Sequence, residues 1–160
     1  MGTDYRAKAG GVEWKCAHIS RLPVLNSAPV QLVYALNTAL KHILESGSLE
    51  QRFQLHRDAS NKMKDELTVM GFGFVPKTRE LSANGMSAVR FPQGIVAADI
   101  VPKLVEKDIV VAGGLHKAIA TEYFRIGHMG ITATDAGRGD VERVIKGIKE
   151  VLEAKGWKKD

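Results

Sequence analysis

The sequence has few of the features that mark secreted or membrane proteins. Its single cysteine, Cys16, cannot form a disulfide within the chain, which fits a reducing compartment. No apolar stretch approaches the roughly 20 residues that cross a bilayer, and the first residues lack the apolar segment of a secretory signal. We therefore expect an intracellular protein without a membrane segment, and the cytoplasmic, mitochondrial and peroxisomal locations stay open.

Signatures of metal sites, nucleotide sites and hydrolytic triads are also missing. The sequence contains no phosphate-binding loop and no dinucleotide-binding glycine fingerprint. Its histidines show no metal-ligand spacing, and no Ser-His-Asp or Cys-His arrangement has local support. The formal charge is +5, but basic residues are interspersed with acidic ones. These observations predict no metal and no nucleic-acid partner.

What remains is the composition of a folded domain, with 44% hydrophobic and 26% charged residues. Residues 1–26 show no sustained period of 3.6 or 2 and contain Gly10-Gly11 and Pro23, so we expect an irregular segment there. The expected domain occupies residues 27–156, and residues 157–160 form a short tail.

Hydrophobic spacing predicts two helices in succession. The first begins near Ser27, with Asn26 or Ser27 as its cap and Pro29 in its first turn, and it ends near Ser46-Gly47. The second is long and amphipathic, and it extends from Ser48 to Gly71. Its expected charged outer face consists of Glu50, Arg52, Arg57, Asp58, Lys62, Lys64, Asp65 and Glu66.

Short β-rich segments follow, and two more helices are interspersed with them. Strands are expected at 72–75, 88–91, 109–112 and 123–128, with the third buried and a turn at 82–85. One helix is expected at 97–107, with a kink at Pro102. The last helix is expected to follow Asp140, which would serve as its N-cap. This order favours an α/β (α+β) fold: a small, mostly antiparallel sheet covered by helices on one face and preceded by a long helix pair.

Arg125 is the most informative single residue. It lies in a short apolar strand, and alternation sends Phe124 and Ile126 to the opposite face. A planar guanidinium on a rigid strand is suited to a carboxylate, which it can bind through two parallel hydrogen bonds. An ion pair with an acid on the open face of the sheet is an equally good explanation of the local sequence.

Two neighbouring features are weaker candidates. Gly113-Gly114 follows an apolar run, where it permits close backbone approach, although a tight turn is the simpler explanation. His128 is close to Arg125 in sequence and is a candidate to line the same pocket. His56 lies at the edge of the apolar face of its helix, a position more typical of packing than of ligation.

Four strings occur in a characteristic order: APVQLVYAL from Ala28, GMSAVRFP from Gly85, IVVAGGL from Ile109 and YFRIGHMG from Tyr123. Together they resemble the C-terminal (small) domain of class V, fold type I pyridoxal-phosphate aminotransferases. The strongest likeness is to the alanine–glyoxylate (serine–pyruvate) type in its fungal form. The resemblance extends from about Ser27 to Lys155.

The resemblance assigns roles to several residues. It implies that Arg125 binds the α-carboxylate of an amino- or keto-acid substrate. It implies that Ser27 contacts the cofactor phosphate of a neighbouring subunit, as in a homodimer, and that Gly113 and Gly114 lie near the substrate entrance. One departure is Val24, which occupies a position where the family usually has a phosphate-binding tyrosine.

The same resemblance places the Schiff-base lysine, the aspartate on the pyridine nitrogen and most phosphate ligands upstream of everything that matches. We therefore expect no catalytic residue and no stably bound pyridoxal phosphate in these 160 residues. The expected function is the substrate-carboxylate-binding domain of an alanine–glyoxylate-type aminotransferase of glyoxylate metabolism, truncated and inactive alone. The alternative is a non-catalytic interaction or regulatory module that pairs with itself or with a full-length homologue.

Overall fold

The computed structural model describes residues 8–9, 12–13 and 29–157, which fall into two units divided after Ser46. In the first unit, β1 (Lys8–Ala9) and β2 (Val12–Glu13) form a short antiparallel pair. The helix α1 (Val30–Glu45) follows, with Pro29 at its N-cap position. The predicted caps Asn26 and Ser27 lie outside the described residues.

The second unit contains the four-stranded sheet and the helices that pack on it. In chain order its elements are α2 (Leu49–Val69), β3 (Gly73–Phe74), the 3-10 turn η2 (Arg79–Leu81), β4 (Met86–Arg90), α3 (Ala97–Val105), β5 (Ala112–Gly113), β6 (Tyr123–Gly127), α4 (Ile131–Thr134), the 3-10 turn η3 (Ala136–Arg138) and α5 (Asp140–Ala154). The two predicted helices at the start and the later alternation of strands and helices are therefore confirmed.

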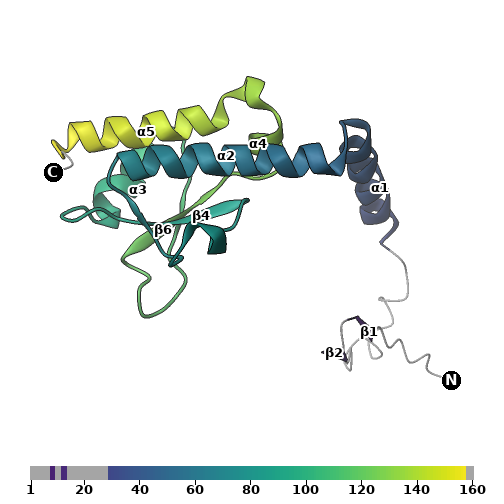
Figure 1. The fold of residues 1–160 in the computed structure, drawn as a ribbon, viewed down its shortest axis with the longest axis horizontal. Helices are drawn as coiled ribbons and strands as arrows, with labels where there is room; N and C mark the ends of the chain where they lie inside the picture. Colours follow the sequence, from purple (N-terminus) through teal and green to yellow (C-terminus); the bar gives the residue numbers. More distant parts are fainter. Residues whose placement is uncertain (1–7, 10–11, 14–28, 158–160) are drawn as a thin grey trace. The chain divides into compact units, whose positions relative to one another are not determined.

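The sheet has the strand order β3-β4-β6-β5, and all of its pairs are antiparallel. β4 and β6 form the long central pair, in which Val89 lies opposite Phe124 and Ala88 lies opposite Arg125. Helices α2 and α5 lie side by side above these strands in Figure 1. The predicted fold class, a small antiparallel sheet covered by helices, is confirmed.

The core lies between the sheet and its helices because β4 and β6 alternate in register. Val89, Phe124 and Ile126 are each at most 2% exposed and belong to the core cluster. The helices contribute Met63, Leu67, Ile100, Leu104, Val141, Ile148, Val151 and Leu152 to the same cluster. The Phe124 ring is central, since it stacks on Phe91 at 5.0 Å and meets Phe72 edge-on at 6.0 Å.

The structure corrects the predicted buried strand at 109–112. Only Ile109 is buried, whereas Val110 is 85% exposed and the strand β5 is limited to Ala112 and Gly113. Ile109 belongs to the turn after α3, where its N–H donates to the carbonyl of Leu104 and the preceding Asp108 has a φ of 56°. β5 is an edge strand, so its apolar residues need not be covered on both faces.

Two further predictions about individual residues are wrong. Lys64 was assigned to the outer face of its helix, but it is 2% exposed and lies in the buried stripe with Ser60, Met63 and Leu67. Asp140 was assigned as an N-cap, but Gly139 holds that position with a φ of 65°. The carboxylate of Asp140 instead accepts a hydrogen bond from Arg138 Nε at 2.8 Å.

The start of α2 is fixed by a reciprocal capping pair. The Ser48 hydroxyl accepts from the Gln51 N–H at 3.1 Å, and the Gln51 side chain accepts from the Ser48 N–H at 3.0 Å. Both backbone groups would otherwise lack a partner in the first turn. The predicted start at Ser48 is confirmed, and so is the predicted stop, because Gly71 has a φ of 86° just after α2.

Replacing Ser48 with Ala removes this cap, and we expect the free energy of unfolding to fall by about 1 kcal/mol. Urea unfolding monitored by circular dichroism measures the change. Ser46→Ala is the matched control, since Ser46 is exposed and its hydroxyl binds only the Ile43 carbonyl at the end of α1. Equal losses in both variants would contradict a specific capping contribution.

Candidate carboxylate-binding site

Arg125 lies at the centre of β6 and on the face of the sheet opposite the core. Its Nε donates a hydrogen bond to the carbonyl of Gly113 on β5, at 2.8 Å. Among the residues that the structure describes, no acid forms an ion pair with Arg125, and its Nη groups have no hydrogen-bond partner. One edge of the guanidinium is thereby fixed, while the two terminal nitrogens remain available.

Small residues flank Arg125 on both sides. Its cross-strand partners are Ala88 on β4 and Ala112 on β5. Directly opposed side chains in a sheet lie about 5 Å apart, so a larger residue at either position would compete for the space beside the guanidinium. The guanidinium is therefore flanked by two alanines, which have the smallest side chain with a Cβ.

Tyr123 connects Arg125 to the loop between β5 and β6. Its phenol oxygen accepts hydrogen bonds from the N–H groups of Leu115 and His116, at 2.9 and 3.2 Å. These two donors, that of His116 first, lower the pKa of Tyr123, and the charge of Arg125 adds to the effect. Tyr123 therefore holds the loop start close to the positive charge.

Gly114 is required by the packing of this loop. A Cβ at this position would lie 2.4 Å from the carbonyl oxygen of Ala120 and 2.7 Å from the Tyr123 ring. Any side chain would push the loop away from the sheet. Gly113 meets no such limit, since nothing lies within 4 Å of its added Cβ, and its contribution is the carbonyl that binds Arg125.

The other candidate residues do not join this group. His128 continues the alternation of β6 towards the core, is fully buried and lies on the face opposite Arg125. Its Nδ1 donates to the Asn84 carbonyl at 3.1 Å, and its Nε2 accepts from the Ser87 hydroxyl at 2.9 Å. Ser27 lies outside the described residues. The structure thus brings together Arg125, Gly113 and Gly114, and it places His128 elsewhere.

Two contacts are not predicted by the sequence, one at this site and one between α2 and the segment after β6. The sequence predicts only a strand position for Tyr123, although side chains two residues apart, such as those of Tyr123 and Arg125, share one face of the sheet. His56 was read as packing, but its Nδ1 donates to the Arg52 carbonyl at 2.7 Å and its Nε2 accepts from the Gly130 N–H at 3.1 Å. No local pattern signals the second contact, which joins residues 74 positions apart in the chain.

Within the described residues, no group of three or more His, Cys, Asp or Glu side chains is arranged to hold a metal ion. No helix in that part of the chain is long and apolar enough to cross a membrane.

Comparisons with known proteins identify relatives of this fold and sequence. The chain is 39% identical over 130 residues to alanine–glyoxylate aminotransferase 1 of Saccharomyces cerevisiae, a match that covers 79% of the chain and 32% of that protein. It is 30% identical over 141 residues to the alanine–glyoxylate aminotransferase of Mus musculus, which covers 88% of the chain and 33% of the relative. No protein-family model matches the chain.

The solved structure of an alanine–glyoxylate aminotransferase from Nostoc sp. superposes with a TM-score of 0.68 and 27% identity, over 79% of this chain and 32% of that one. The chain is homologous to the C-terminal domain of class V, fold type I aminotransferases. It spans about a third of the length of the curated relatives that it matches.

A first prediction concerns the anchor at Tyr123. Tyr123→Phe leaves two backbone N–H groups of the loop without their acceptor, and we expect it to lower the free energy of unfolding of the domain by about 1–2 kcal/mol. The amides of Leu115 and His116 should exchange with solvent several-fold faster, as measured by hydrogen–deuterium exchange. Unchanged exchange at both amides would show that the phenol oxygen does not hold the loop.

A second prediction concerns His128. Burial lowers the pKa of His128 from its ordinary value of 6.5, chiefly by desolvation, so the unfolded chain binds a proton at higher pH than the folded chain does. The stability contributed by neutral His128 is complete above about pH 6.5 and is lost as the pH falls through the folded-state pKa. As the pH falls through this window, the urea concentration at the midpoint of unfolding should fall for the wild type and should fall less for His128→Gln. Parallel pH profiles would contradict this assignment.

Proposed function

We propose that this domain binds the α-carboxylate of an amino- or keto-acid substrate through Arg125, as part of an alanine–glyoxylate-type aminotransferase. The observation that carries the proposal is the geometry of Arg125, whose Nε is fixed by Gly113 while its two Nη groups lack partners among the described residues. A guanidinium presented in this way offers two parallel N–H donors, which match the two oxygens of a carboxylate.

The names of the relatives support the class of ligand. Alanine and glyoxylate, the substrates in the names of the yeast and mouse proteins, both carry a carboxylate next to the reacting carbon. Transfer of the amino group from alanine to glyoxylate would give pyruvate and glycine, which retain that carboxylate. One fixed arginine can therefore serve both halves of the reaction by orienting each substrate through its unchanging group.

Pyridoxal phosphate is the cofactor expected for the parent family, and it supplies the electron sink for amino transfer. The residues around Arg125 fit the substrate's carboxylate and not this cofactor. The residues directly opposite Arg125 are alanines, Ala88 and Ala112, which carry neither an amine nor an acid. A lysine amine and an acid for the pyridine nitrogen would have to come from elsewhere, as the family resemblance implies.

From this we propose that the 160 residues alone do not transaminate and hold no pyridoxal phosphate stably. Arg125 orients a substrate, but orientation without the cofactor accelerates no step. We also propose that Ser27 contributes a hydroxyl to a cofactor phosphate across a homodimer, and that Gly113 and Gly114 border the substrate entrance.

An interaction module derived from the family is the second candidate function, and one observation favours it. Helix α1 has no buried residue, although it carries Val33, Leu36, Leu40 and Leu44 on one apolar stripe. An apolar stripe of this kind favours association with another surface. A second copy or a full-length homologue is the partner that this reading proposes.

A titration with pyruvate tests the role of Arg125 directly. The 15N-labelled chain should show pyruvate-dependent shifts at Arg125, Ala88 and Ala112, and Arg125→Gln should weaken binding at least about tenfold, since a charge-assisted hydrogen bond contributes about 1.5–3 kcal/mol. Arg57→Gln is the matched control, because Arg57 is exposed on α2 and binds only Gln54. Stability should change by less than about 1 kcal/mol in both variants.

Two results would contradict the proposal. Unchanged pyruvate affinity in Arg125→Gln would remove the carboxylate role. A loss of more than about 2 kcal/mol of stability with affinity unchanged would instead make Arg125 a structural residue of the sheet edge.

A further inference from the structure

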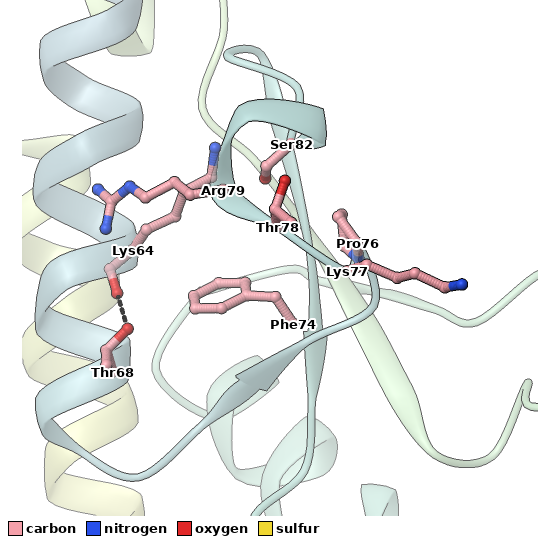
Figure 2. Close-up of a pocket in the computed structure, with 8 residues that line it drawn as sticks. All are labelled: Lys64, Thr68, Phe74, Pro76, Lys77, Thr78, Arg79 and Ser82. Carbon is pink, nitrogen blue, oxygen red and sulfur yellow. Dashed lines mark hydrogen bonds between the residues drawn. The ribbon is translucent and has the colours of Figure 1, made fainter.

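A polar cavity lies between α2 and the segment that follows β3, away from Arg125 (Figure 2). Its volume is about 350 Å³, and it is lined by Lys64, Thr68, Phe74, Pro76, Lys77, Thr78, Arg79 and Ser82. Three of these residues are basic, three carry hydroxyl groups and none is acidic. This size lies in the range of small-molecule sites.

Lys64 gives this cavity a buried ammonium group. The residue is 2% exposed, its Nζ donates to the Ala83 carbonyl at 2.9 Å, and no carboxylate of the described residues forms an ion pair with it. An ammonium has three donors, so two remain without an acceptor among those residues. Burial, and then the nearby charge of Arg79, lower the pKa of Lys64. A buried cation without a carboxylate is costly, and an anion in the cavity would offset that cost.

The surrounding charges leave a positive excess. Arg79 is bound to α2, through Asp65 at 2.5 Å and through the backbone and side-chain oxygens of Asn61. The Thr78 hydroxyl donates to Glu80 and lowers the pKa of that exposed carboxyl. Lys77 is exposed and has no ion pair with a described residue. Lys64, Lys77 and Arg79 therefore carry three positive charges. The two nearby carboxylates, Asp65 and Glu80, already have partners.

The apolar wall of the cavity is formed by Phe74. Its ring points towards α2, and the side chain of Lys77 points away from Lys64 and Phe74 (Figure 2). The long stem of Lys77 allows its ammonium to reach an anion at the mouth of the cavity. A ligand that contacts both the basic side chains and the Phe74 ring needs an oxyanion at one end and a small apolar group at the other.

We propose that this cavity binds a small organic oxyanion, a phosphate or carboxylate attached to an apolar group. Lys64, Lys77 and the Ser82 hydroxyl contact the oxyanion, and Phe74 contacts the apolar group. The site shares no lining residue with the region around Arg125, so it does not depend on the proposed function.

The probe is phenyl phosphate, titrated into the 15N-labelled chain and followed by NMR. Shifts should be confined to α2, Phe74 and residues 76–82. Inorganic phosphate should bind several-fold more weakly at the same residues because it lacks the ring, and phenol should not bind because it lacks the charge. Benzoate distinguishes the two oxyanions: binding tighter than that of phenyl phosphate assigns the site to carboxylates, and weaker binding assigns it to phosphates.

Variants separate this site from general attraction to a basic protein. Lys77→Ala should weaken phenyl phosphate binding about fivefold, as expected for one exposed ion pair. Lys149→Ala, the same charge change at an exposed position of α5, should leave affinity unchanged, and so should Arg125→Gln. Phe74→Leu should weaken binding of phenyl phosphate but not of inorganic phosphate. Lys64→Met should abolish binding, and if it does not fold, the comparison of Lys77→Ala with Lys149→Ala decides.

Two outcomes would overturn the inference. One is a set of shifts spread over the basic residues of the whole surface. The other is an equal loss of affinity in Lys77→Ala and Lys149→Ala, which would show that net charge, and not the cavity, attracts the anion.

Discussion

Side-chain alternation along β6 is the constraint on which the rest of the aminotransferase domain depends. Phe124, Ile126 and His128 must point to the same side, where they meet Val89 and Ser87 of the paired strand and the helices above them. Burial of two large apolar side chains fixes this register, because a slip of one residue would expose both. Arg125 is then necessarily on the other face, held there by the packing of its neighbours.

This arrangement separates the side chains that stabilise the fold from the proposed ligand-binding side chain of Arg125 within the five residues of β6. Core packing supports β6 from one side, so Arg125 can keep its terminal nitrogens unengaged without loss of the fold. The edge strand β5 adds the one contact that the core cannot provide, the Gly113 carbonyl that accepts from Arg125 Nε. Tyr123 and Gly114 hold the following loop against the same face, which places its first residues beside the positive charge.

Much of this could be predicted from local patterns. Spacing over a few residues predicts the cap at Ser48 and the end of α2 at Gly71. It also predicts that Arg125 and Phe124 lie on opposite faces of the sheet. The burial of Lys64 could not be predicted this way, because the Ala83 carbonyl that accepts its hydrogen bond lies on a loop 19 residues away. The exposure of Val110 could not be predicted either, because the composition of a short apolar run does not show whether other elements cover it. His128 differs from these two cases: strand alternation puts it on the core side, because residues three apart along a strand lie on opposite faces.

The central claim is that the Gly113 carbonyl fixes one edge of the Arg125 guanidinium and leaves the other edge for a carboxylate. The most direct measurement follows the side-chain 15N resonances of Arg125 in the free chain and with pyruvate. We expect an Arg125 Nε–H that exchanges slowly with solvent even without ligand, and Nη resonances that shift when pyruvate is added. An Arg125 Nε–H that exchanges as fast as those of exposed arginines, with Nη resonances that do not respond to pyruvate, would contradict it.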